Sequence, residues 1–338
     1  MMSHSVDESD PAYDYVNYVN ASSMSALVDE FDDLATGRAQ RPRRRVHSTI
    51  RNRIDDHAVL EHLDHMVKNS GPLFQHFLAS VPGILEEMSR VGAALNRLAR
   101  SRAPREKRAL TFYEGDAFDG TNGRALVEAA QGAVVSLTSS PNKANEPWFY
   151  RFADPRLSQY FPESLFLLSS EELKSDHYFG SFSEGFDFFY ETAAFQFYGT
   201  DRKAQVGHVA ELLRADGIAF FLEKFDHEDS TEYEVREDVK DRLHKSLYFS
   251  SEEIEWKREA MLARMSEGQV TLAEMSEALH THFGHVHLLW NGGNFCEVVA
   301  SDSKERLSEF LEVLGPPLIP DEFCRESVMR PLGQSRYT

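Results

Sequence analysis

Four histidines stand close together in the segment HTHFGHVH: His280, His282, His285 and His287. Alternate residues of a strand share one face, so His285 and His287 could chelate a metal ion. The segment holds no cysteine and no H-E-x-x-H motif, and His280 and His282 would point in different directions on a helix. We therefore predict no metal, and a histidine base at the edge of a substrate is the more favoured chemical role.

A second chemical pattern is the stretch FYEGDAFDGTNGRAL at residues 112–126. An apolar run leads to Glu114 and then to small and acidic residues, as in the strand–loop–helix turns that bind nucleotides. Such loops usually carry glycine where this chain has Asp116 and Phe118, because the backbone approaches the ligand and adopts positive φ. Only Gly120 keeps a glycine at a matching position. We expect Phe118 to force the loop onto a different path.

The elements that would position these residues alternate between short apolar runs and helices. Continuous apolar runs joined by helices are typical of a parallel sheet buried on both faces. A tight turn over residues 291–294, with sequence NGGN, indicates a hairpin across 285–301. In LLRADG, Gly217 is expected to end a helix that leads directly into a strand. The other strands are predicted at 109–115, 133–140, 164–170, 186–195 and 217–225.

Helical and polar segments surround this alternating region. Residues 1–56 are polar, and their arginine-rich run predicts a solvated, partly disordered segment. Residues 57–107 carry apolar positions three and four apart, which predicts two or three amphipathic helices. The α/β domain would then occupy 108–338, with a charged helical insertion at about 226–284.

Composition narrows the range of partners. The chain has 338 residues and a net charge of −19, which argues against nucleic acid and against an anionic membrane surface as partners. Its two cysteines imply no disulfide framework, and no apolar stretch is long enough to span a bilayer. The polar, acidic N-terminus is unlike a secretory signal. We expect a cytoplasmic protein.

Strand–helix alternation that closes with a hairpin resembles the class I S-adenosylmethionine-dependent methyltransferase family, over roughly residues 108–315. The resemblance implies a Rossmann-like α/β fold with a seven-stranded, mostly parallel sheet and a C-terminal antiparallel hairpin. It also implies a cofactor at the carboxyl ends of the first strands, which agrees with the general rule for open α/β sheets. In this family an N-terminal helical extension and a helical insertion typically shape the acceptor pocket and cover the cofactor.

The resemblance also assigns roles to individual residues. After the second strand, hydroxyl and amide groups stand where the family has an acid for the ribose. The cofactor-binding candidates follow the first four strands: Glu114, Gly115, Asp116, Gly120, Thr121 and Asn122; Thr138, Ser139, Ser140 and Asn142; Ser170 and Glu171; Glu191 and Thr192.

Three residues are candidates for catalysis. Glu191 and Tyr190 end the fourth strand, where the methyl donor and acceptor meet in the family. Glu191 could act as a base, or it could bind the cofactor or cap the following turn. His208 lies on a helix that is expected to pack on the sheet, so we favour a buried structural role for it over a catalytic one. Glu223 and Lys224 could orient an acceptor or form a simple ion pair.

The sequence therefore predicts transfer of a methyl group from S-adenosylmethionine, leaving S-adenosylhomocysteine. The acceptor would be an oxygen or nitrogen of a small molecule in natural-product metabolism. The alternative is a homologue that binds the cofactor as a scaffold or uses it for another reaction, such as a cyclisation. A homodimer through the N-terminal helices is a further prediction. A nicotinamide dehydrogenase is disfavoured, because GDAFDGTNG lacks the G-x-G-x-x-G fingerprint.

Overall fold

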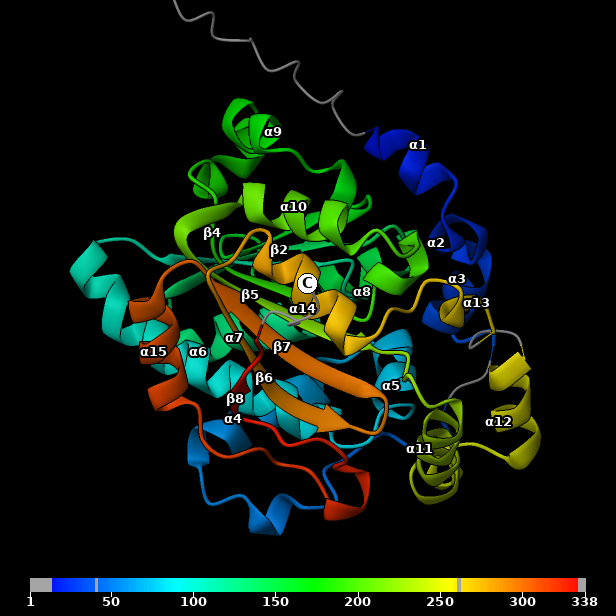
Figure 1. Ribbon diagram of the computed structural model, residues 1–338. Helices are drawn as coiled ribbons and strands as arrows, with labels where there is room; N and C mark the ends of the chain where they lie inside the picture. Colours follow the sequence, from blue (N-terminus) through cyan, green and yellow to red (C-terminus); the bar gives the residue numbers. More distant parts are fainter. Residues whose placement is uncertain (1–13, 40–41, 260–262, 334–338) are drawn as a thin grey trace, which may run out of the picture.

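A computed structural model describes residues 14–39, 42–259 and 263–333. Its centre is an eight-stranded sheet of order β3-β2-β1-β4-β5-β7-β6-β8 (Figure 1). Strands β1 to β5 are parallel, whereas β7, β6 and β8 are antiparallel to their neighbours. The strands are β1 Leu110–Gly115, β2 Val134–Ser139, β3 Ser158–Phe161, β4 Phe186–Thr192, β5 Leu213–Lys224, β6 His285–Gly292, β7 Phe295–Ser301 and β8 Arg330–Pro331.

This order confirms the Rossmann-like α/β fold and the mostly parallel sheet with an antiparallel C-terminal hairpin. The predicted turn over 291–294 joins β6 to β7, and Gly293 has the positive φ of 67° that a tight hairpin turn requires. The sheet has one strand more than the seven that the resemblance implies. The extra strand is β8, which pairs two residues with the outer edge of β6.

Helices cover both faces of the sheet (Figure 1). None of them, within the described ranges, combines the length and apolarity needed to cross a bilayer. The helices are α1 Tyr15–Asn20, α2 Ser23–Ala26, α3 Val28–Thr36, α4 His57–Asn69, α5 Pro72–Leu78, α6 Ile84–Glu106, α7 Thr121–Ala130, α8 Glu146–Phe152, α9 Ser170–Ser175, α10 Arg202–Leu212, α11 Ser230–Leu243, α12 Ser251–Lys257, α13 Ala263–Ser266, α14 Leu272–His280 and α15 Lys304–Val313.

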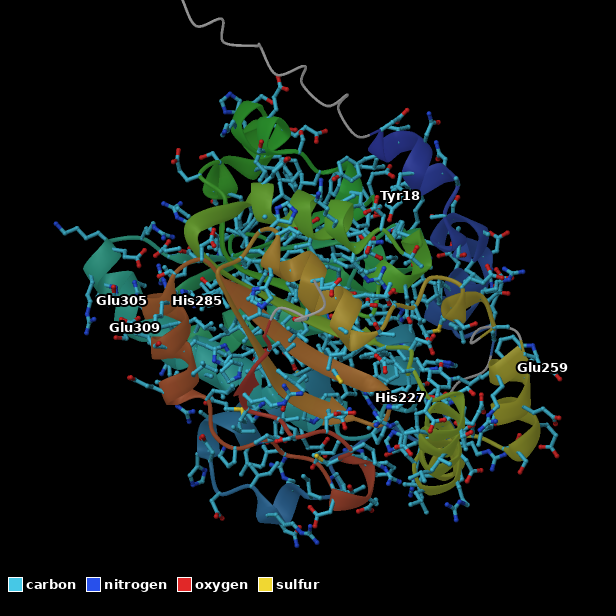
Figure 2. The ribbon with its side chains drawn as sticks, in the orientation of Figure 1. Tyr18, His227, Glu259, His285, Glu305 and Glu309 are labelled. Atoms are coloured by element: carbon cyan, nitrogen blue, oxygen red, sulfur yellow. The ribbon has the colours of Figure 1, made fainter. Side chains whose placement is uncertain are left out.

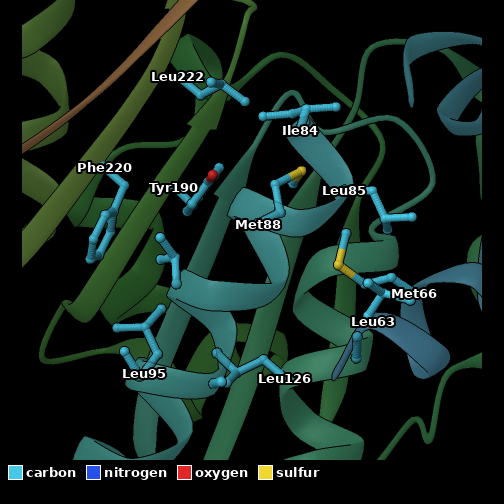
Figure 3. Close-up of a cluster of buried hydrophobic side chains, with 14 of the residues drawn as sticks. Leu63, Met66, Ile84, Leu85, Met88, Leu95, Leu126, Tyr190, Phe220 and Leu222 are labelled. Carbon is cyan, nitrogen blue, oxygen red and sulfur yellow. The ribbon is translucent and has the colours of Figure 1, made fainter. Parts of the chain in front are cut away.

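Two hydrophobic cores hold these layers together, one on each face of the sheet. Successive residues of a strand point to opposite faces, so Phe220 of β5 enters one core and Phe221 enters the other. Figure 3 shows the first core, where Met88 and Leu95 of α6 face Tyr190 and Phe220. Burial on both faces explains why the central strands read as continuous apolar runs.

The predicted strand at 164–170 is wrong. The third strand is β3, which ends at Phe161, and residues 165–167 form a short 3₁₀ helix before α9. The Ser164 side chain accepts a hydrogen bond from the backbone of Phe166, and Ser169 forms a capping box with Glu172. These local side chain–backbone hydrogen bonds favour turns and helix starts over a strand.

The predicted helix stop at Gly217 is also wrong. Helix α10 ends at Leu212, and β5 begins at the next residue by pairing Leu213 with Phe186. The register then shifts before Ile218 pairs with Phe188. A Cβ on Gly217 would lie 3.0 Å from the Phe186 carbonyl oxygen. The glycine therefore permits close approach of two strands at an irregularity, a role that Gly often has in strands.

The arginine-rich segment is attached to the protein surface, and most of its arginine side chains are exposed to solvent, as the sequence predicts. The Arg45 guanidinium donates to the Val67 carbonyl at 2.7 Å, and the Val46 amide donates to Gln75 Oε1 at 2.8 Å. Arg51 forms a two-pronged ion pair with Asp64. These contacts fix residues 42–53 on α4 and α5. The described part of 1–56 also contains α1, α2 and α3, whereas residues 1–13 and 40–41 lie outside the described ranges.

Phe220→Ala should lower the free energy of unfolding by about 3–5 kcal/mol, as is typical of removing a buried aromatic ring. The ring is fully buried, stacks on Tyr190 at 5.7 Å and meets Phe310 edge-on at 5.0 Å. Urea unfolding monitored by circular dichroism measures the change. Val235→Ala is the control, because Val235 is 43% exposed on α11. A loss below about 1 kcal/mol for Phe220→Ala would contradict the described packing.

Candidate functional site

A cavity lies at the carboxyl ends of β1, β2 and β4, with about 840 Å³ of empty space that includes space open to solvent at its mouth. The sheet side of the cavity is formed by Asp116, Phe118, Asn142 and residues 192–194. Helices α2, α3, α5, α11, α12 and α13, which gather on one side of the molecule in Figure 1, surround it. Its apolar lining includes Met24, Phe31, Leu73, Phe77, Phe197 and Met265.

The loop after β1 has left-handed backbone at alternate residues, although two of these residues are not glycine. Asp116, Phe118 and Gly120 have φ angles of 47°, 52° and 70°. Phe118 therefore adopts the positive φ that glycine usually supplies in such loops. A left-handed conformation costs a non-glycine residue roughly 1–2 kcal/mol, so surrounding contacts must stabilise the loop.

The Asp116 carboxylate supplies much of that stabilisation. Its Oδ1 accepts hydrogen bonds from the Leu165 amide at 2.7 Å and from Ser139 Oγ at 3.1 Å. Its Oδ2 accepts from Ser164 Oγ at 3.0 Å and from the Tyr198 hydroxyl at 2.5 Å. Burial raises the pKa of Asp116 to about 6, although these donors act in the opposite direction. The carboxylate thus connects the β1 loop to the segments that follow β3 and β4.

The Phe118 ring packs on α5 and forms part of the cavity wall. Its centroid lies 5.7 Å from that of Phe74 and 5.0 Å from that of Phe77. The cavity keeps its empty volume beside this ring, so Phe118 does not fill it. The aromatic contact with α5 therefore compensates for the left-handed backbone and narrows the site with an apolar surface.

Glu114 lies under the start of α7 rather than on the cavity wall. Its Oε2 accepts a hydrogen bond from the Gly123 amide at 2.9 Å, which satisfies one of the free amides at a helix N-terminus. Burial raises its pKa to about 8. Gly115, the last residue of β1, is packed so closely that a Cβ would lie 2.9 Å from the Phe189 ring. Glu114 and Gly115 therefore support the β1 loop through contacts inside the protein.

The residues at the N-terminus of α7 also contact the protein interior rather than the cavity. A Cβ on Gly120 would lie 2.6 Å from Thr138 Oγ1, so only glycine fits there without displacement. Thr121 Oγ1 donates to Asp119 Oδ1 at 2.8 Å, and Asn122 Oδ1 lies 3.4 Å from His62 Nε2. None of these predicted cofactor contacts lines the cavity.

The polar groups after β2 are mostly used within the protein. Ser139 Oγ accepts from the Asp116 amide at 2.9 Å, and Ser140 Oγ accepts from Asn145 Nδ2 at 3.1 Å. Thr138 Oγ1 is buried and makes no hydrogen bond within the described residues. Asn142 lines the cavity, and its Nδ2 makes only a long 3.5 Å hydrogen bond to the Val28 carbonyl. Asn142 is therefore the member of this group that is placed to meet a ligand.

Ser170 and Glu171 lie in the first turn of α9, outside the cavity. Glu171 is exposed, and Figure 1 shows α9 at the edge of the molecule away from α5 and α11. Their contact with the cofactor stays a prediction from the resemblance.

Glu191 caps the turn that follows β4. Its Oε1 accepts hydrogen bonds from the amides of Ala194 and Phe195, the latter at 3.3 Å. The Glu223 carboxylate accepts from the same Phe195 amide at 3.0 Å and pairs with Arg202 at 3.2 Å. Burial and the neighbouring Glu223 raise the pKa of Glu191 well above its ordinary value. This geometry favours the capping interpretation over a role as general base.

Tyr190 and His208 are packed in the two cores. The Tyr190 ring lies next to Phe220 in Figure 3, and burial raises its pKa well above the ordinary value. His208 Nε2 lies 2.9 Å from the Leu165 carbonyl oxygen, and its ring lies 4.6 Å from that of Tyr15. Burial lowers the pKa of His208 to about 4. Neither side chain lines the cavity, so both fit a structural role better than a catalytic one.

The histidine-rich segment is remote from the cavity. His280 Nε2 lies 3.0 Å from the Leu332 carbonyl oxygen. In the view of Figure 2, His285, Glu305 and Glu309 are labelled on one side of the molecule and Glu259 on the other. Over the described ranges, no three or more His, Cys, Asp or Glu side chains are arranged to hold a metal ion.

Five polar residues on the cavity wall were not singled out from the sequence: His76 of α5, Ser80 in the turn after it, and the lysines Lys240, Lys245 and Lys257. The lysines belong to the segment that was interpreted only as a charged helical insertion. Their burial depends on how α11 and α12 pack against α5, and no local sequence pattern indicates that packing. Lys224 forms the predicted ion pair, with Glu237 at 3.1 Å.

No family model matches this chain, and no curated protein matches it. Solved structures that resemble it include the cyclopropane synthase MmaA2 from Mycobacterium tuberculosis, with 12% identity, 91% of this chain and 83% of that chain covered, and a TM-score of 0.39. The plantazolicin methyltransferase BamL, in complex with a triazolic desmethylPZN analog and SAH, has 11% identity, coverage of 86% and 87%, and a TM-score of 0.43. A probable spermidine synthase from Corynebacterium glutamicum has 11% identity, coverage of 67% and 72%, and a TM-score of 0.37. These values are too low to transfer a function.

Glu114→Gln should flatten the fall in stability that is expected as pH rises from about 4.5 to about 8. Folded Glu114 keeps its proton up to about pH 8, whereas the unfolded carboxyl releases it near 4.5. The folded state therefore binds more protons between these values, and this contribution to stability falls as pH rises through the window. The effect amounts to a few kcal/mol, at about 1.4 kcal/mol per pH unit.

Melting temperatures of the wild type and the variant, measured between pH 5 and pH 9, test this expectation. The glutamine side chain of the variant keeps an acceptor for the Gly123 amide but has no proton to release. Glu171→Gln, on an exposed carboxylate, is the matched control and should leave the pH profile unchanged. Parallel profiles for the wild type and Glu114→Gln would show that Glu114 does not hold its proton.

Proposed function

We propose that this protein transfers a methyl group from S-adenosylmethionine to an oxygen or nitrogen of a small molecule. The observation that supports this most is the place of the cavity, at the carboxyl ends of β1, β2 and β4 in a sheet of this order. Ligands of open α/β sheets bind at that edge. Participation in natural-product metabolism and a homodimer stay predictions from the sequence.

The sheet side of the cavity suits a polar cofactor. Thr192 lines the cavity, and its Oγ1 is buried and makes no hydrogen bond within the described residues. An unsatisfied buried hydroxyl costs roughly 1–3 kcal/mol, and a polar ligand would remove that cost. Asp116 and Asn142 add further polar groups on the same side. Thr192 and Asn142 would hold the cofactor, which when bound supplies an electrophilic methyl group, whereas the Asp116 carboxylate is already engaged by four internal donors and would shape the loop beside it.

The chain itself would contribute position and exclusion of water. The apolar side chains of α2, α3 and α5 close the cavity around a ligand, which favours a dry and defined arrangement of the two reactants. Glu191, Tyr190 and His208 lie outside the cavity lining, so we do not propose a base among them. Orientation of the acceptor therefore carries the larger share of the proposed catalysis.

One observation favours the alternative, a cofactor-binding homologue without methyl transfer. The cavity is not lined by Gly120, Thr121 or Asn122, which contact the rest of the protein instead. The loop presents the apolar ring of Phe118 to the cavity. Such a loop offers the cofactor fewer polar contacts than the resemblance implies. The two functions differ in turnover rather than in binding.

Isothermal titration calorimetry with S-adenosylmethionine and S-adenosylhomocysteine tests the proposal first. We expect binding of both, and formation of S-adenosylhomocysteine when a library of small-molecule acceptors is added. The absence of binding at millimolar cofactor would contradict the proposed function. Tight binding without turnover on any acceptor would instead favour the alternative.

Thr192→Val should weaken S-adenosylhomocysteine binding about 5–10-fold while leaving the fold intact or slightly more stable. The substitution removes one hydrogen bond to the ligand, which corresponds to about 1 kcal/mol, and also removes an unsatisfied hydroxyl from the free protein. Calorimetry gives the affinity, and thermal unfolding gives the stability.

Thr138→Val is the matched control, because Thr138 Oγ1 is equally buried and unpartnered within the described residues but lies beneath Gly120 rather than on the cavity wall. It should affect stability as Thr192→Val does and leave affinity unchanged. Equal affinities for Thr192→Val and the wild type would remove Thr192 from the proposed cofactor site.

A further inference from the structure

Buried positive charge collects at the end of the cavity that is formed by the helical insertion. Lys240, Lys245 and Lys257 line the cavity, and all three are almost fully buried, with exposures of 2%, 1% and 5%. Lys224 of β5 is also buried, whereas Arg258, which follows α12, borders the group with a side chain that is 39% exposed and also lies 3.9 Å from the Glu234 carboxylate. Such a group is costly to bury unless negative charge compensates it.

Two carboxylates form the close ion pairs of this group within the described residues. Glu237 lies 2.6 Å from Lys240 and 3.1 Å from Lys224. Asp241 lies 2.7 Å from Lys245 and 2.5 Å from Arg258. The ammonium groups of Lys224 and Lys245 are at ion-pair distance but make no well-directed hydrogen bond. Each carboxylate is therefore already shared between two cations.

Lys257 has no carboxylate at ion-pair distance within the part of the chain that the structure describes. Its Nζ donates to Ser80 Oγ at 2.5 Å, lies 2.6 Å from His76 Nε2 and sits 4.2 Å from the Phe249 ring centroid. Neutral partners and an aromatic face stabilise a cation less than an anion does. The cluster thus holds five cationic side chains, of which Lys257 is stabilised at close range by neutral groups alone.

Burial without sufficient negative charge has the expected electrostatic consequence. It lowers the pKa of Lys245 to about 8 and lowers the pKa values of Lys240 and Lys257 as well. The other lysines of the cluster contribute to each of these shifts. An anion in the adjoining cavity would reverse the effect by pairing with the charged form.

We propose that the cavity binds an amphipathic acid, with its carboxylate or phosphate at Lys240, Lys245 and Lys257 and its apolar body along Phe31, Leu73 and Phe77. The apolar walls match a hydrocarbon or aromatic body, and the lysine cluster provides the site for the missing negative partner. This inference deepens the proposed function and rests on it, because the acid is the acceptor whose other end approaches the carboxyl end of β4.

Binding of defined probes to the full-length protein tests the inference without turnover. The probes are decanoate, decyl phosphate, decanol and acetate, each titrated by calorimetry in the absence of cofactor. We expect at least one of the two decyl acids to bind tenfold or more tightly than decanol, and acetate to show no binding. The preferred acid shows which head group the cluster recognises. Equal affinities for decanol and both acids would overturn the inference.

Lys257→Met should reduce the affinity for the preferred acid at least tenfold and leave decanol binding unchanged. The substitution keeps much of the length of the side chain and removes the ammonium that lacks a close carboxylate, so the melting temperature should stay the same or rise. Lys203→Met, on the exposed side of α10, is the matched control. If Lys257→Met does not fold, Lys245→Met tests the same expectation. Wild-type acid affinity in a folded variant would contradict the inference.

The cofactor's own carboxylate is the competing anion, and a parallel titration separates the two. If Lys257→Met weakens S-adenosylhomocysteine binding and not acid binding, the lysines serve the cofactor and the inference is wrong. If the acid binds through Lys257 but no cofactor binds, the acid site stands and methyl transfer fails. If cofactor binds and neither acid binds, only the inference fails.

Discussion

The carboxylate of Asp116 joins three segments that are distant in the sequence. It receives hydrogen bonds from Ser139 at the end of β2, from Ser164 and Leu165 after β3, and from Tyr198 after β4. These segments meet at the carboxyl edge of the sheet, where the cavity opens. The same carboxylate belongs to a residue with positive φ, so its hydrogen bonds hold the β1 loop in a conformation that costs a non-glycine residue free energy. The shape of the sheet side of the cavity therefore depends on this one buried group.

The fold could be predicted from the sequence because its signals are local and periodic. Apolar runs indicated four of the parallel strands, and the Asn-Gly-Gly-Asn turn indicated the antiparallel hairpin. The errors arose where short-range hydrogen bonds or close packing outweighed the apolar pattern. Ser164 and Ser169 turned an apolar run into helical turns, and Gly217 proved to be a packing position inside β5.

The site was less predictable than the fold. Position along a strand indicated which segments reach the cavity, but not which way each side chain points. Thr192 and Asn142 line the cavity as the resemblance implies, whereas Glu191 turns back to its own backbone. The lysines of the helical insertion were missed because their burial arises from contacts with α5 and the turn after it. The bond between Lys257 and Ser80, for example, joins residues that are 177 positions apart in the chain.

Two buried clusters of charged side chains lie near the turn after β4. One has an excess of negative charge and the other an excess of positive charge, and the two excesses are compensated in different ways. Glu223 pairs with the Arg202 guanidinium, whereas burial and the neighbouring Glu223 raise the pKa of Glu191 well above its ordinary value, which favours its neutral form. The backbone amides of Ala194 and Phe195 cap this pair of carboxyl groups, which lies outside the cavity lining. The lysine cluster has an excess of positive charge and faces the cavity rather than backbone amides. Loss of a proton would remove positive charge, but Lys240 and Lys245 would lose their ion pairs and Lys257 would donate more weakly to Ser80. An anion from outside would instead retain these interactions and add new ones. We therefore expect the lysines to bind an anionic ligand and the two glutamates to support the structure of the turn after β4.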